Sequence, residues 1–389
     1  MNTAILALNA GSSSLKFALY PRAGALLALA SGEVQGLGTQ ARLHAQRDGA
    51  AAETQALPDV NDVHAALQVV TEWIMRHFAD IHFAAIGHRV VHGGTKYTAP
   101  VVVDDAVLRE LDALDPLAPL HQPFNLDALR HMQQRFPGAR TVACFDTAFH
   151  AHWDDRTARL ALPRRFHDAG IRRYGFHGLS YEFLTARLRE LAPGAQHIVL
   201  AHLGSGASIC AVQHGRSIDC TMGFSALDGL PMSTRCGALD ASVIFHLQRQ
   251  GIISDEIERM LYHDSGLKGM SGISGDMREL LASPRAEAGQ AVAVFTRRCS
   301  SAIGALSTQL GAVDALVFSG GIGAHAAAVR ESICAQLRLF GIEIDSGANA
   351  ADEERISAPG TRVPVFALRT DEQLVIARAC SALLEALRA

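Results

Sequence analysis

The sequence predicts an α/β protein in which one strand–turn–strand unit occurs twice. The first unit covers residues 4–20 and the second covers residues 198–212, about half a chain later. In each unit an apolar strand leads into a turn of small residues, and a second apolar strand follows. Between the two units, short apolar strands alternate with segments of helical periodicity. Together these observations indicate a duplicated α/β domain.

Composition sets broad limits on the class of protein. The 389 residues are 49% hydrophobic and 19% charged, enough for two or three domains with large cores. The net charge of −4 gives no basic field for a nucleic-acid partner. We expect neither a membrane span nor secretion, because long apolar runs and a signal sequence are both missing. The seven cysteines lack a Cys-x-x-Cys motif, so we expect free thiols in the cytoplasm.

The first turn joins two predicted strands, residues 4–8 and 15–20, at the start of an antiparallel meander over residues 1–50. It contains Gly11, Ser12, Ser13 and Ser14. Its backbone amides and hydroxyls could cradle a phosphate, or it could be an ordinary hairpin turn. No Gly-Lys-Ser/Thr opens a helix after it, which excludes a Walker loop.

Helical spacing of apolar residues predicts a helix over residues 59–78. A strand from residue 84 is then expected to enter a glycine-rich loop carrying Arg89, either as a functional group or as a surface residue. Helices are predicted over 104–114 and 125–135. The prolines between them predict an extended, non-helical stretch over residues 116–123.

Asp146 follows the predicted buried strand 140–145. At the carboxyl end of a strand, α/β folds place metal-binding or catalytic groups. Residues 172–180 contain two arginines, aromatic residues and a histidine. This segment leads into a helix predicted over 181–191.

The second half contains a long loop, residues 223–237, whose single cation is Arg235. Further helices are predicted over 242–250, 254–263 and 286–310. A strand at 316–318 should enter a glycine-rich turn and a helix through residue 335, an arrangement suited to nucleotide binding.

The chain should end with a strand over 363–366 and a helix over 374–387. Thr370 and Gln373 fit a capping box for this helix. Asp371 and Glu372 could be acids placed favourably at a helix N-terminus, or functional groups.

The small-residue turns and the glycine-rich turn together predict an ATP site. Asp146 and Glu372 are carboxylates that could hold Mg²⁺ directly or through water. Arg89 and Arg235 could each clamp an anion with two hydrogen bonds. One arginine would serve the phosphoryl group and the other the acceptor, which would itself be an anion.

Five motifs, in order, resemble those of the acetate kinase family. They are residues 8–17, 87–94, 145–150, 174–178, and 229–232 with Thr234-Arg235, and the likeness runs from about residue 4 to residue 385. The resemblance implies two ribonuclease-H-like domains around a nucleotide cleft, the actin-like ATPase duplication. Residues 1–148 with 372–389 would form the acetate-side domain and 149–371 the nucleotide-binding domain. It also implies a homodimer that reversibly makes acetyl phosphate and ADP from acetate and ATP with Mg²⁺, or alternatively Mn²⁺.

Matched by motif, the resemblance implies these site residues. The catalytic residues would be Arg89, Asp146, His177 and Arg235. Acetate would contact Arg89, Val91, Leu120, Phe176 and Ala226. Asn9, His121, His177 and His202 would lie near the phosphates, and Asn9, Asp146 and Glu372 would hold the metal. The nucleotide would contact Ser14, Lys16, His202, Leu203, Gly204, Ser205, Gly206, Asp276, Met277, Arg278, Gly321, Ile322, Gly323 and His325.

The chain departs from the family pattern at several positions. Ser205 replaces the usual Asn of the second turn, Ala324-His325 replaces Glu-Asn, Ser233 replaces Gly, and Ala226 replaces Pro. Every charged catalytic group is kept. Two alternatives stay open: a kinase of the same fold acting on propionate, butyrate or a sugar, and a catalytically weak actin-like nucleotide-binding module.

Overall fold

The structure is a computed structural model that describes residues 2–11 and 14–388. The chain divides into two compact units. Unit 1 comprises Met1–Ala151 and Asp371–Ala389, and unit 2 comprises His152–Thr370. The sequence-based boundaries, 148/149 and 371/372, lie within three residues of these.

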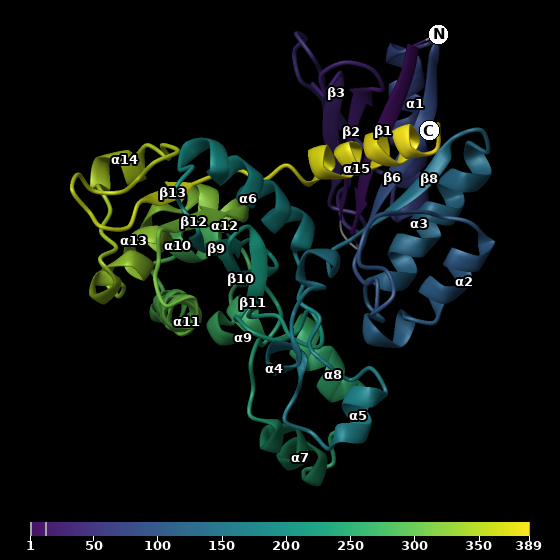
Figure 1. Cartoon of the computed structure of the whole chain (residues 1–389). Coiled ribbons are helices and arrows are strands. Elements are labelled where there is room, and N and C mark those ends of the chain that lie inside the picture. The colour runs from purple at the N-terminus through teal and green to yellow at the C-terminus, as the bar shows by residue number, and fades with distance from the viewer. Residues whose placement is uncertain (1, 12–13, 389) are drawn as a thin grey trace. The chain divides into compact units, whose positions relative to one another are not determined.

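Each unit contains one β-sheet (Figure 1). The strands of unit 1 are β1 (Asn2–Ala10), β2 (Ser14–Pro21), β3 (Ala30–Gln35), β4 (Arg42–Arg47), β5 (Glu53–Ala56), β6 (Ile81–Val90), β7 (Val101–Val102) and β8 (Arg140–Phe145). Those of unit 2 are β9 (His197–Leu203), β10 (Ala207–Gln213), β11 (Arg216–Cys220), β12 (Ala315–Ser319) and β13 (Val365–Ala367).

Helices accompany both sheets. Unit 1 has α1 (Val63–His77), α2 (Asp105–Asp112), α3 (Gln122–Arg135) and α15 (Glu372–Ala386), with short 3₁₀ helices at Asp115–Leu117 and Ala148–His150. Unit 2 has α4 (Asp155–Ala158), α5 (Arg164–Asp168), α6 (Gly178–Leu191), α7 (Ala241–Arg249), α8 (Ser254–His263), α9 (Gly266–Ser271), α10 (Met277–Ala282), α11 (Ala286–Leu310), α12 (Gly320–His325), α13 (Ala327–Ala335) and α14 (Ser346–Ala350), with a 3₁₀ helix at Arg338–Phe340.

The two sheets share one topology. Unit 1 contains the order β3-β2-β1-β6-β8 within an eight-stranded sheet, and unit 2 contains β11-β10-β9-β12-β13. In both, three antiparallel strands are followed by two that run parallel to the first. The duplicated α/β domain predicted from the sequence is therefore confirmed.

The sheet of unit 1 is covered on both faces at its neighbouring strands β1 and β6. Leu6 and Leu8 pack in a core with residues of α1 and α3. On the other face α15 lies directly on β6, because a Cβ at Gly87 would be 2.3 Å from Cγ2 of Ile376. Helix α15, yellow in Figure 1, crosses these strands. Its first residue, Glu372, reaches the end of β1, where Asn9 Nδ2 donates to Glu372 Oε2 at 2.6 Å.

Several predicted element boundaries were wrong. Helix α1 starts at Val63 because Asp62 caps it, accepting from the Ala65 amide at 2.8 Å. The stretch 116–123 is not wholly extended: a 3₁₀ helix covers Asp115–Leu117, and Pro123 lies in the first turn of α3. Proline is tolerated there because an amide of the first turn needs no helical partner.

The glycine-rich and C-terminal segments also differ from expectation. Residues 320–323 form the start of α12 itself, and the predicted helix through 335 is broken at Ala326. Asp371, rather than Thr370, caps α15 by accepting from the Leu374 amide at 2.9 Å. Arg89 lies within β6 and not in the loop after it.

All seven cysteines are free thiols, and six of them are buried. Among residues 2–11 and 14–388, no helix is long and apolar enough to span a membrane.

His88 makes folding sensitive to acid. Its side chain is buried in β6, Nε2 has no partner within residues 2–11 and 14–388, and burial lowers the pKa from 6.5 to about 3. The unfolded chain therefore binds a proton below pH 6.5 that the folded chain does not. The contribution of neutral His88 to the free energy of unfolding is fully present above pH 6.5. It is lost as the pH falls toward 3, and the loss at pH 5 is ~2 kcal/mol.

We therefore expect His88→Leu to reduce the loss of unfolding free energy between pH 8 and pH 5. Urea denaturation at the two pH values measures it. His82→Asn, at an exposed position of the same strand, is the matched control and should leave the pH dependence unchanged. An equal pH dependence in His88→Leu and wild type would contradict the assignment.

Candidate functional site

In unit 1, four side chains far apart in the sequence meet at one edge of the sheet. Asn9 ends β1, Arg89 lies near the end of β6, Asp146 follows β8, and Glu372 begins α15. Because β1, β6 and β8 are parallel, their carboxyl ends lie along the same edge. We call Asn9, Arg89, Asp146 and Glu372 the unit 1 polar group.

A continuous set of hydrogen bonds joins this group. Arg89 donates to both oxygens of Asp146, from Nε at 2.9 Å and from Nη2 at 2.5 Å. Its Nη1 donates to Asn9 Oδ1 at 3.1 Å, and Asn9 Nδ2 donates to Glu372 Oε2 at 2.6 Å. Arg89 reaches Asp146 from the neighbouring strand, so a cation that is distant in the sequence pairs with this carboxylate.

The charges of the group are strongly coupled. Burial opposes charge on the Arg89 guanidinium, but Asp146 and then Glu372 outweigh it, and the pKa of Arg89 rises above its ordinary value. Burial raises the pKa of Glu372, and Asp146 adds to this, whereas Arg89, Lys16 and Asn9 oppose it. Two carboxylates are thus held close together by the charge of Arg89, and Lys16 on β2 assists at Glu372.

The oxygens of this group fit a magnesium ion that brings its own water and phosphate ligands. Mg²⁺ typically uses one or two protein carboxylates and keeps several waters. Over the described residues no cluster of three or more His, Cys, Asp or Glu side chains could hold a metal. Unit 1 instead offers two carboxylates and one amide oxygen, a partial set of hard oxygen donors.

In unit 2, two histidines and an arginine gather around the second small-residue turn. His177 precedes α6 in a left-handed conformation (φ 59°), and its ring centroid lies 4.4 Å from that of His202 at the end of β9. A Cβ at Gly206 would be 3.2 Å from Nε2 of His177 and 4.0 Å from Nη1 of Arg235. We call His177, His202, Arg235 and the turn 204–206 the unit 2 polar group.

Arg235 is held by its own loop. Its Nη1 donates to the carbonyl of Ala226 at 3.0 Å and lies 3.6 Å from Sδ of Met232. The amide of the neighbouring Ser233 donates to the Ser205 carbonyl at 3.1 Å. The loop and the turn are therefore fixed to each other through the backbone.

Two further predicted nucleotide segments also approach this turn. A Cβ at Gly204 would be 3.8 Å from the Gly321 amide at the start of α12. Ser233 Oγ donates to the Gly275 carbonyl at 2.5 Å, which brings Asp276 close to the turn. Ser233 departs from the family pattern, and its hydroxyl links the two loops.

The remaining predicted residues are placed as follows. Ser12 and Ser13 lie outside the described residues; Ser14 begins β2, and Lys16 pairs with Asn9 across the hairpin. Met277 is buried in α10, whereas Arg278 is exposed and pairs with Asp276 at 2.5 Å. In unit 1, Val91 is buried and both Leu120 and His121 are partly exposed; in unit 2, Phe176 is buried and Ala226 is partly exposed. Leu203 is buried at the end of β9, and Ile322 lies in α12.

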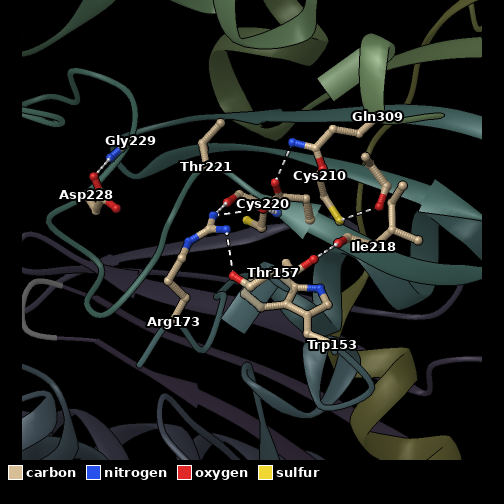
Figure 2. A network of polar contacts seen from close by, with 12 residues as sticks. Trp153, Thr157, Arg173, Cys210, Ile218, Cys220, Thr221, Asp228, Gly229 and Gln309 are labelled. Atoms are coloured by element: carbon tan, nitrogen blue, oxygen red, sulfur yellow. Dashed lines mark hydrogen bonds and ion pairs between the residues drawn. The ribbon is translucent and has the colours of Figure 1, made fainter. Parts of the chain in front are cut away.

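Arg173, next to a family motif, belongs to a different network (Figure 2). It donates to Asp219 Oδ1 at 2.8 Å and to the Cys220 carbonyl at 2.5 Å, and its guanidinium lies over the Trp153 ring. Gln309 binds the other Asp219 oxygen at 2.8 Å. This network connects β11 to two other segments, the chain that precedes α6 and helix α11. Its role is therefore structural.

His325 carries a prediction for nucleotide affinity. It ends α12, and its Nδ1 lies 3.5 Å from Oδ2 of Asp352, which also binds the buried Arg330 at 2.6 Å. Arg330 in turn donates to the Gly323 carbonyl at 3.0 Å. With the substrates that the family resemblance implies, we expect His325→Ala to raise the KM for ATP more than the KM for acetate, because it perturbs the end of α12. Steady-state kinetics with each substrate varied test this, and an equal or reversed effect would place His325 away from the nucleotide.

The chain matches the acetokinase family over residues 4–378. It is similar to an acetate kinase of Methylocella silvestris, with 45% identity over an alignment of 404 residues, gaps included, that covers 100% of both chains. It is also similar to one of Rhodopseudomonas palustris (strain TIE-1), with 45% identity over 97% of this chain and 98% of the relative.

Two solved structures are similar throughout. An acetate kinase of Porphyromonas gingivalis gives a TM-score of 0.85 at 32% identity, over 98% of this chain and 100% of the other. A propionate kinase of Francisella tularensis gives 0.89 at 34% identity, over 97% of this chain and 98% of the other. Sequence and structure agree over nearly the whole length, and the chain therefore belongs to the acetokinase family.

Proposed function

We propose that this chain reversibly transfers a phosphoryl group from ATP to acetate, giving acetyl phosphate and ADP. One observation carries the proposal. The residues of the family motifs, up to 363 positions apart as for Asn9 and Glu372, form two compact polar groups rather than scattered surface residues. A weak nucleotide-binding module would not need the two arginines and the coupled carboxylates.

The mechanism follows from where charge develops. In phosphoryl transfer the moving group carries negative charge on its equatorial oxygens, so positioning and electrostatics supply most of the catalysis. We assign Arg89 and Arg235 to the oxygens of acetate and of the phosphoryl group, and His177 to a hydrogen bond on an equatorial oxygen. Acetate is already ionised, so this reaction needs no general base, unlike transfer to a sugar hydroxyl.

The metal and nucleotide assignments rest on the same two groups. Asn9, Asp146 and Glu372 would hold Mg²⁺, or Mn²⁺, which neutralises phosphate charge when bound. The turn 204–206, residues 276–278 and the start of α12 with His325 would bind the nucleotide. His121 and His202 would lie near its phosphates. We place the enzyme in the cytoplasm.

The decisive test is ATP-dependent acyl-hydroxamate formation with a panel of short carboxylic acids and sugars. Hydroxamate with acetate supports the proposal. ADP release with a sugar but no hydroxamate would indicate a sugar kinase. If neither ADP nor hydroxamate forms, the protein would be a nucleotide-binding module without kinase activity. Propionate is the second candidate acceptor, because the similar Francisella tularensis structure is that of a propionate kinase.

Acceptor size gives a quantitative prediction. Val91 is 3% exposed in unit 1 and is proposed to limit the acyl chain, whereas Ala226 is smaller than the family's usual Pro. One methylene in an apolar pocket is worth ~1–3 kcal/mol, so we expect acetate to be preferred over propionate by roughly 10-fold, and butyrate to be poor.

The variant Val91→Ala should shift preference toward propionate and leave the KM for ATP nearly unchanged. Values of kcat/KM for the three acids on both proteins measure the shift. An unaltered preference would show that Val91 does not line the pocket. If the wild type prefers propionate, propionate replaces acetate as the proposed substrate. The protein would then still be a short-chain acyl kinase.

We also propose a homodimer that uses helix α7. None of the residues of α7 is buried within the chain, and two of its large apolar side chains are exposed, Phe245 by 57% and Val243 by 37%. Phe245→Glu should therefore give monomers by light scattering at concentrations where the wild type is dimeric. Leu339→Glu, an equally drastic change at a residue 88% exposed elsewhere in unit 2, is the control. A dimeric Phe245→Glu variant would exclude this surface.

A further inference from the structure

We infer that Tyr181 and Ser208 form a positioning relay that fixes His177 as a neutral hydrogen-bond donor through Nε2. The inference rests on the proposed phosphoryl transfer, and it assigns roles to two residues that lie outside the motif-derived site. Neither residue is a catalytic residue, since each acts through His177.

The three side chains lie in a row. Ser208 Oγ is 2.8 Å from Nδ1 of His177, and the hydroxyl of Tyr181 also hydrogen-bonds Ser208 Oγ. Ser208 belongs to β10 and Tyr181 to α6, one helical turn after His177, and both side chains are fully buried. Strand β10 and helix α6 of unit 2 therefore hold the imidazole of His177 at its Nδ1 atom.

The chemistry of these groups sets the direction of the protons. Burial raises the pKa of Tyr181 well above its ordinary value, so the phenol keeps its proton and can donate it to Ser208. A serine hydroxyl has a single proton. We assign this proton to His177 Nδ1, 2.8 Å away, which makes that nitrogen the unprotonated acceptor.

The neighbouring Cys220 adds no charge to this arrangement. Its thiol lies close enough to Ser208 and Tyr181 to hydrogen-bond with them, and burial raises its pKa to about 11. The thiol is therefore neutral at physiological pH. No ionised group enters the relay from this side.

With Nδ1 as acceptor, the imidazole proton lies on Nε2, the atom nearest the turn 204–206. A Cβ at Gly206 would be 3.2 Å from that nitrogen. A donor at this point suits a phosphoryl oxygen, whereas an unprotonated nitrogen would repel it. The relay thus supplies a donor without requiring a charged imidazolium.

The second histidine is anchored in the same way. Ser180 Oγ is 2.8 Å from Nδ1 of His202, whose ring centroid is 4.4 Å from that of His177. Two imidazolium ions this close would repel each other, which disfavours a doubly protonated pair. Serine hydroxyls at both Nδ1 atoms are consistent with two Nε2–H donors.

The test combines NMR with kinetics on the full chain. In wild-type protein labelled with ¹⁵N-histidine, His177 should show an unprotonated Nδ1 and a protonated Nε2 at pH 6–8. Ser208→Ala should give mixed tautomers or protonation in that pH range. Its kcat should fall about 10- to 100-fold, as for loss of the outer partner of a functional histidine, with little change in either KM. Ser208→Thr, which keeps a hydroxyl, should restore both readouts.

Thr185→Val is the matched control, because Thr185 is a buried hydroxyl of the same helix whose Oγ1 has no hydrogen-bond partner within the described residues. It should change neither the tautomer nor kcat. Tyr181→Phe keeps the ring and removes only the first donor, so it tests the relay if Ser208→Ala fails to fold. It should give mixed tautomers and a smaller fall in kcat.

A protonated Nδ1 in the wild type, or Ser208→Ala with normal kcat and an unchanged spectrum, would overturn the inference. The NMR readout does not depend on turnover. A wild type that shows the expected tautomer but makes no acyl hydroxamate would therefore refute the proposed function and leave the relay intact.

Discussion

Arg235→Ala should lower kcat/KM by ~10²–10⁴-fold, because it removes a charged donor aimed at developing negative charge. The fold should survive the change. The loop around Arg235 is held by its backbone: the Met232 amide donates to the Arg235 carbonyl at 3.0 Å, and the Ser265 amide donates to Thr234 at 2.9 Å. Arg235→Lys should recover little activity, because an ammonium lacks the planar fork that grips two oxygens.

Steady-state kinetics and thermal denaturation of the same preparations separate the two effects. Arg298→Ala is the control, since Arg298 is an exposed arginine of α11 that belongs to neither polar group. It should leave both kinetics and melting unchanged. Near-normal kcat/KM in Arg235→Ala would remove Arg235 from the site, and a large loss of melting temperature would indicate a structural residue instead.

Local patterns were enough to predict the duplicated fold. Apolar runs separated by small residues gave both hairpins, and a long stretch of helical periodicity gave α11 with both ends correct at 286 and 310. These signals are local because strand and helix periods are set by backbone geometry. The order of strands in each sheet then follows from the antiparallel meander and the parallel crossovers.

Contacts between distant residues could not be predicted in the same way. Arg89 and Asp146 are 57 residues apart, and only the pairing of β6 with β8 brings them together. Motif resemblance named both residues but gave no information about their ion pair. Helix caps failed for a related reason: Thr370 and Asp371 are adjacent candidates, and backbone geometry decides which one accepts the bond.

The relay residues were missed because buried hydroxyls look like ordinary strand and helix residues. The sequence pattern places Ser208 at the start of an apolar strand, where it matches Ser14 of the first unit, and Tyr181 as the first residue of a helix. One signal was available. Tyr181 lies four residues after His177, a spacing that puts both on the same side of a helical turn.

Asp146→Asn should abolish most Mg²⁺-dependent turnover and also destabilise unit 1. Sequence reasoning alone predicts normal folding for this variant, but the bidentate pair with Arg89 changes that expectation. The Asp146 side chain is 1% exposed, and removing one partner of a buried ion pair costs about 3–5 kcal/mol. An asparagine still accepts one hydrogen bond from Arg89, so we expect the lower part of that range.

Stability and catalysis can be separated by a second variant and a control. The double variant Arg89→Gln/Asp146→Asn removes both charges and should regain part of the lost stability without regaining turnover. Asp219→Asn breaks a comparable pair with Arg173 in the network of Figure 2. It should lose stability while keeping the Mg²⁺ concentration dependence of kcat, because Asp219 belongs to neither polar group.

The measurements are urea denaturation for the free energy of unfolding and kcat as a function of Mg²⁺ concentration. If Asp146 has only a structural role, its variant should resemble Asp219→Asn, with activity that follows the folded fraction. If Asp146 helps to hold the metal, turnover should stay low even where Asp146→Asn is fully folded, and more Mg²⁺ should be needed for half-maximal rate. Full turnover of the folded Asp146→Asn protein at ordinary Mg²⁺ would leave Asp146 as the partner of Arg89 alone, and the metal would then have to be held by Glu372 and Asn9.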